Sequence, residues 1–155
     1  MVAVAPRWKS QNAGIVALSL VGVVFVAAAF DKALDIDGFS YIIQYHINSR
    51  SPLVVSGLTV MVLIWEAVLG VSLLTDVGAT FGIRAAVGTL IVFSLALTRM
   101  ILDPASPESC GCGRVLSLLQ DAEAASVVGL LRNGLLIACL LFGARASYVP
   151  TRFQQ

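Results

Sequence analysis

The sequence is poor in charged residues. Only 12% of its 155 residues are Asp, Glu, Lys or Arg, against about a quarter in a typical soluble domain. Ten basic and nine acidic side chains leave a net charge of +1, so the chain lacks the basic surface that binds nucleic acid. Hydrophobic residues make up 58% and the mean hydropathy is +0.91, which excludes intrinsic disorder. This composition predicts an integral membrane protein.

Histidine and the familiar catalytic motifs are scarce as well. His46 is the only histidine, beside three methionines, which excludes a haem held by two histidines. The chain has no Walker loop, no dinucleotide-binding fingerprint and no HExxH motif. Only His46 can add a soft ligand to the cysteines, so we expect no metal site.

Four long apolar stretches dominate what is present. They cover residues 13–30, 53–75, 79–102 and 125–145, and a spanning helix needs about 20 residues. We therefore predict an all-α integral membrane protein, a four-transmembrane-helix bundle made of one membrane domain, 1–155. The first stretch also resembles a signal peptide, with Arg7 and Lys9 before it. Three further spans favour a helix that is retained.

Basic residues in the loops predict the orientation. The side that holds both termini carries five of them, namely Arg7, Lys9, Arg84, Arg145 and Arg152. The loops on the other side carry three, namely Lys32, Arg50 and Arg114. Because Lys and Arg favour the cytoplasmic side, we expect cytoplasmic termini. The loops at 31–52 and 103–124 then face outward.

The first outer loop contains a helical pattern. Phe39, Ile42, Ile43, His46 and Ile47 fall on one face of a helix, which predicts a short interfacial helix lying on the membrane surface. On that face His46 has two interpretations. It can shuttle protons or donate to a quinone carbonyl, or it can be an ordinary packing residue.

The strongest local signal is Cys110-Gly111-Cys112, in the second outer loop. Two cysteines this close can bring their Cα atoms within the roughly 7 Å that a disulfide needs. A strained, exposed disulfide is readily exchanged, and Arg114 favours the thiolate of Cys112. Three interpretations of this pair remain open: thiol–disulfide chemistry, a static disulfide that staples the loop, and, least favoured, metal binding or two incidental cysteines. Cys139, far along the last span, is expected to be a packed core thiol.

Glu66 and Arg132 are charges inside the predicted spans. Each costs at least about 2.5–3.5 kcal/mol at mid-bilayer, so such residues usually pair and often function. A Glu66–Arg132 pair is either a structural pin or part of a proton path or cofactor pocket, and Asn133 can add a hydrogen bond across the bundle. Lys32 either joins this cluster or is a solvated helix end.

Several short motifs, in this order and spacing, resemble the MauE branch of the DoxX-like membrane proteins, named for methylamine utilisation. The resemblance runs from about Gly14 to Phe142. It is carried by Phe25–Asp35 (FVAAAFDKALD), Phe39–Tyr45, Trp65-Glu66 with Leu69-Gly70, Cys110–Gly113, and Leu131-Arg132-Asn133 with Leu135-Leu136.

This resemblance implies a four-helix bundle in a bacterial inner membrane. It also implies a role in periplasmic thiol redox, often with a thioredoxin-like partner, tied to disulfide formation or to the maturation of a secreted enzyme. The residues that match the family are Cys110, Cys112, Glu66, Arg132 and Lys32.

Two functional hypotheses follow. In the first, the chain is a thiol–disulfide oxidoreductase that relays electrons through Cys110 and Cys112 between a thioredoxin-like partner and a membrane quinone. Glu66 is the candidate proton acceptor, and the candidate quinone or thiolate ligands are Arg132, His46, Arg99 and Lys32. In the second, it is a non-catalytic subunit that anchors or assembles a larger membrane complex. A third hypothesis, that the chain is a small-molecule transporter, is supported only by the charged residues Glu66 and Arg132 inside the spans.

Overall fold

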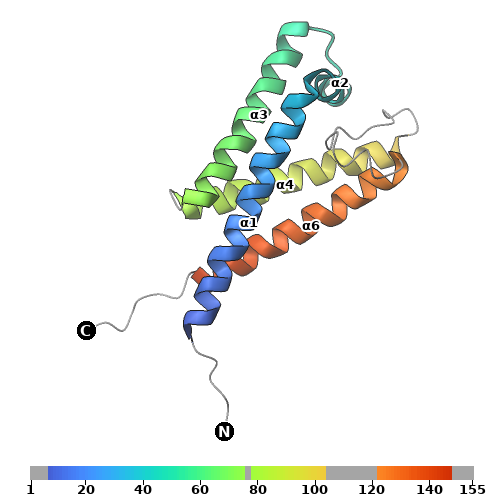
Figure 1. Cartoon of the computed structure of the whole chain (residues 1–155). Coiled ribbons are helices and arrows are strands. Elements are labelled where there is room, and N and C mark those ends of the chain that lie inside the picture. The colour runs from blue at the N-terminus through green and yellow to red at the C-terminus, as the bar shows by residue number, and fades with distance from the viewer. Residues whose placement is uncertain (1–6, 76–77, 104–121, 148–155) are drawn as a thin grey trace.

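The structure is a computed structural model that describes residues 7–75, 78–103 and 122–147. Those residues form five helices and no strand (Figure 1), namely α1 (Arg7–Leu34), α2 (Ile36–Ile47), α3 (Pro52–Thr75), α4 (Ala79–Leu102) and α6 (Ala122–Ser147). Within α1, α3, α4 and α6, segments of 21–24 residues are long and apolar enough to cross a membrane. The all-α, multi-pass membrane fold expected from composition is confirmed.

α1 is longer than its uncharged stretch. The apolar stretch predicts a helix over residues 13–30, yet α1 continues through Asp31 and Lys32 to Leu34. The helix does not need to stop at the charge, because Lys32 meets a carboxylate on α3. Asp35 then caps α2 by accepting a hydrogen bond from the Gly38 N–H at 3.3 Å.

The long helices pack around one apolar core. α1 lies along both α3 and α6, and α4 lies along α6. All four contribute to the core, which contains Leu18, Val21, Phe25, Leu69, Leu73, Ala86, Leu90 and Leu140. α1 and α3 approach each other closely at Gly22 and Gly70, where a Cβ on either glycine would lie within 3 Å of the other's carbonyl oxygen. Many large apolar side chains remain exposed on the outer surface, as expected for contact with lipid.

The short helix expected in the first outer loop is α2, and it bridges the bundle. Its buried residues are Phe39 and Ile42. Ser40 Oγ lies 3.2 Å from Thr59 Oγ1 of α3, and His46 Nε2 lies 3.2 Å from the Ala96 carbonyl oxygen of α4. α2 therefore spans from α3 to α4, at the end of the bundle where α1 and α4 finish and α3 and α6 begin (Figure 1). We call this the α2 end, and α1 begins and α6 finishes at the opposite end.

Candidate functional site

The centre of the site is an ion pair between α1 and α3. Lys32 Nζ lies 2.7 and 2.9 Å from the two carboxylate oxygens of Glu66. The side chains are 10% and 2% exposed. Lys32 Nζ also lies 5.5 Å from the centre of the Phe39 ring and 5.3 Å from that of Phe93, within the range of a cation–π interaction. Aromatic faces and one carboxylate thus replace the water that Lys32 gives up.

The expected Glu66–Arg132 pair does not form. Within the described residues, the ion pair of Glu66 is with Lys32. Helix length explains how Lys32 reaches Glu66. Glu66 lies 14 residues into α3, about 21 Å along its axis, and Lys32 is in the last turn of α1. α3 extends beyond the end of α1 (Figure 1), so these two residues lie at one level.

Arg132 nevertheless belongs to the same site. It lines a small cavity of about 20 Å³ together with Lys32, Glu66 and Asn133, and apolar residues of α1, α4 and α6 complete the wall. We call this cavity the polar chamber. The Arg132 Nε is buried there with no hydrogen-bond partner among the described residues. A carboxylate, two cations and an amide are therefore gathered inside an otherwise apolar bundle.

Asn133 ties the chamber to α4. Its Nδ2 donates to Ser94 Oγ at 3.3 Å, and the Ser94 hydroxyl donates to the Leu90 carbonyl oxygen at 2.7 Å. Asn133 is 1% exposed. The hydrogen bond across the bundle that the sequence predicted for Asn133 is confirmed. Its partner Ser94 could not be predicted, because a serine in a spanning helix usually donates its hydrogen bond within its own helix.

His46 and Arg99 lie in a second group, which joins α2 to α4. The His46 ring nitrogens face two carbonyl oxygens, Ile42 O at 2.9 Å and Ala96 O at 3.2 Å. A neutral imidazole has one N–H and can donate to only one of them at a time, whereas an imidazolium can donate to both. Arg99 Nη1 donates to the His46 carbonyl oxygen at 3.2 Å. Neither residue lines the polar chamber.

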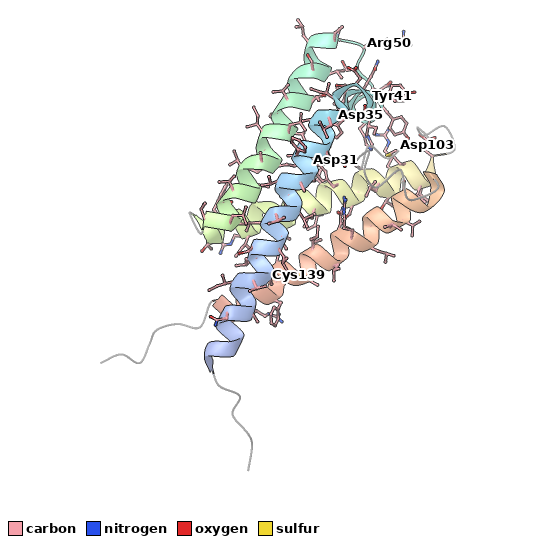
Figure 2. All side chains as sticks on the ribbon, viewed as in Figure 1. Asp31, Asp35, Tyr41, Arg50, Asp103 and Cys139 are labelled. Carbon is pink, nitrogen blue, oxygen red and sulfur yellow. The ribbon has the colours of Figure 1, made fainter. Side chains whose placement is uncertain are left out.

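Tyr45 and Asp103 complete this second group, which we call the α2–α4 clamp. The Tyr45 hydroxyl donates to Asp103 Oδ2, and the Arg99 guanidinium lies 5.4 Å from the centre of the Tyr45 ring. The hydrogen bond to the Asp103 carboxylate, followed by desolvation, raises the pKa of Tyr45 above its usual 10.0. Figure 2 labels Asp103, Tyr41, Asp35 and Asp31 toward the α2 end of the bundle. Nothing in the sequence indicated Asp103 as the partner of Tyr45.

Of the three cysteines, the structure describes Cys139 alone. Cys110 and Cys112 lie outside the described residues, in the stretch that joins α4 to α6. Cys139 is a partly buried free thiol on α6, packed against the core and far from the labelled residues of the α2 end in Figure 2. The expectation that Cys139 is a packed thiol is confirmed.

These observations define a multi-pass membrane protein with a buried polar site between its spanning helices. Comparison with protein families matches residues 10–146 to the family described as methylamine utilisation protein MauE. The chain belongs to this family. No curated protein and no solved structure matches it.

Proposed function

We propose that this protein is a membrane thiol–disulfide redox protein that relays electrons between a thioredoxin-like partner and a membrane quinone. A thiolate of the reduced partner attacks the Cys110–Cys112 disulfide, and a mixed disulfide forms as that bond breaks. The partner's second thiol then attacks the mixed disulfide. The partner leaves oxidised, and Cys110 and Cys112 remain as a dithiol.

The second half-reaction restores the disulfide. The dithiol gives two electrons and two protons to the quinone, which becomes a hydroquinone, and the Cys110–Cys112 bond forms again. Glu66 accepts a proton in transit, Lys32 holds its carboxylate, and Arg132 stabilises charge that develops on the acceptor. His46 and Arg99 act by positioning α2 over this site.

The observation that carries this proposal is the polar chamber. Charged groups inside a membrane span are costly and usually functional, and Lys32, Glu66 and Arg132 meet around one cavity. The cysteine motif follows Asp103, at the α2 end, by seven residues, a reach of at most about 25 Å. In the proposed topology this end faces the periplasm, the termini face the cytoplasm, and the protein lies in a bacterial inner membrane.

The test is a relay assay on the full chain in nanodiscs. Reduced thioredoxin serves as the donor and a fully substituted short-chain benzoquinone as the acceptor. Alkylation reports the donor's thiols, and absorbance reports quinone reduction. The native chain should couple the two above the uncatalysed rate. The Cys110→Ser/Cys112→Ser variant should lose this coupling, while Cys139→Ser, a cysteine far from the α2 end, should retain it.

The potential of the cysteine pair provides a second readout. Exchange catalysts lie between about −120 and −230 mV, and a reversible couple in this range is expected. A pair locked as a disulfide below about −300 mV, together with full coupling in the double serine variant, would contradict the relay. It would favour the non-catalytic subunit of a larger membrane complex.

A further inference from the structure

Two buried polar atoms of the polar chamber have no hydrogen-bond partner among the described residues. They are Arg132 Nε and Asn133 Oδ1. An unpaired buried polar group is unfavourable because it loses its hydrogen bonds to water, so two of them beside one cavity indicate a missing ligand. The Arg132 Nε–H can only donate a hydrogen bond, and an amide oxygen can only accept one.

The neighbouring hydrogen bonds fix which way the Asn133 amide points. The single proton of the Ser94 hydroxyl is given to the Leu90 carbonyl oxygen at 2.7 Å. Ser94 Oγ must therefore accept from Asn133, and the group 3.3 Å away is the amide nitrogen. The amide oxygen is left as the unused acceptor, and turning the amide over would place two acceptors against each other.

One donor and one acceptor select the ligand chemistry. A bare anion would satisfy Arg132 but would meet the lone pairs of Asn133 Oδ1. A cation would face Lys32 and Arg132, of which only one charge is balanced by Glu66. A carbonyl oxygen would leave Asn133 unpaired. An oxygen that carries a hydrogen satisfies both groups, because it accepts from Arg132 and donates to Asn133.

The size of the chamber agrees with this pattern. Its volume of about 20 Å³ exceeds the roughly 10–15 Å³ that one water needs, and it is far too small for a ring. We propose that the polar chamber is a binding site for one hydroxyl oxygen, held between Arg132 Nε and Asn133 Oδ1. Water is one source. The phenolic hydroxyl of a hydroquinone, with its ring outside the chamber, is the other, and that source rests on the proposed function.

The first arm of the test observes the bound hydroxyl in the native chain by NMR. The full chain is labelled with ¹⁵N-arginine, placed in nanodiscs without added quinone, and searched for a cross-peak between the Arg132 Nε–H and a bound hydroxyl proton. Arg132→Lys assigns the resonance by its disappearance. Asn133→Leu should remove the cross-peak. Gly134→Ala, the next residue, where a Cβ has nothing within 4 Å, should leave it unchanged.

The second arm distinguishes the two sources. A short-chain hydroquinone is titrated beside its dimethyl ether and the matching quinone. If hydroquinone is the ligand, it displaces the water signal and binds about tenfold more tightly than the ether, the worth of one hydrogen bond. Asn133→Leu should abolish that difference. If the water signal persists unchanged, the site is a hydration site.

A dry chamber in the native chain, with no preference among the three compounds, would overturn the inference. The relay can fail separately, because Cys110→Ser/Cys112→Ser should lose electron transfer while the Arg132 cross-peak stays. Conversely, a relay that works in a chain with a dry chamber would leave the proposed function intact and refute only this site.

Discussion

Lys32 of α1 and Glu66 of α3 form a bidentate ion pair, in which the Lys32 ammonium lies 2.7 Å from one carboxylate oxygen and 2.9 Å from the other. The two residues are 34 positions apart in the chain. Their pairing fixes the last turn of α1 against the middle of α3, and it places a carboxylate in the wall of the polar chamber. The position of the whole site depends on this contact.

Removal of either partner of the pair should destabilise the bundle strongly. Lys32→Met leaves Glu66 buried without its cation, and Glu66→Gln leaves Lys32 without its carboxylate. Each is expected to cost about 3–5 kcal/mol, because an uncompensated buried charge remains. The double variant should be markedly more stable than the sum of the two losses predicts. Unfolding in detergent micelles measures all four chains, and strictly additive losses would contradict the pairing.

Gly70 should tolerate no side chain. A Cβ there would lie 2.6 Å from Val26 Cγ2, 2.8 Å from the Gly22 carbonyl oxygen and 2.9 Å from the Val26 nitrogen. Two of these are backbone atoms, so α1 and α3 must separate. Gly70→Ala is expected to cost about 1–3 kcal/mol.

The matched control for this change is Gly88→Ala on α4, where a Cβ has nothing within 4 Å. Thermal unfolding of the two variants should differ clearly, with Gly88→Ala close to the native chain. Equal stability of the two variants would mean that α1 and α3 do not approach as described.

Tyr45 should titrate late, and its contribution to stability should be lost only at high pH. Its pKa is raised, first by the hydrogen bond to Asp103, so the hydroxyl is more firmly protonated in the folded chain than in the unfolded one. This contribution to stability is fully present below the unfolded pKa, about 10, and is lost as the pH rises through the higher folded pKa.

Ultraviolet titration of tyrosinate can test this. Tyr45→Phe should remove the step at highest pH, and Asp103→Asn should move that step to lower pH. If Tyr45→Phe removed an earlier step and left the last one, the contact with Asp103 would not hold in solution.

His46 should hold the end of α2 on α4. His46→Ala removes both ring contacts to carbonyl oxygens and is expected to speed hydrogen exchange of the α2 amides about tenfold, the worth of one hydrogen bond. Gln44→Ala, an exposed position on the same helix, is the matched control. Mass spectrometry of peptides from α2 measures both, and equal exchange in the two variants would show that α2 is held without His46.

Much of the fold was predictable from residue type. An apolar stretch of about 20 residues can satisfy its backbone in lipid only as a helix, so α3, α4 and α6 follow directly from composition. The apolar spacing from Phe39 to Ile47 predicted the α2 helix. The end of α1 was not, because the charge of Lys32 suggests a helix end until its partner is known.

The sequence by itself determined that the chain spans a membrane with four helices, and that Glu66 and Arg132 need partners there. Tertiary structure alone decided which partners they meet. Helix length and depth brought Lys32 to Glu66 and left Arg132 Nε beside Asn133 in the chamber. Packing also placed His46 and Arg99 in the α2–α4 clamp and away from the chamber. Pairing between helices depends on rotation and axial offset, which no local pattern in a uniformly apolar span encodes.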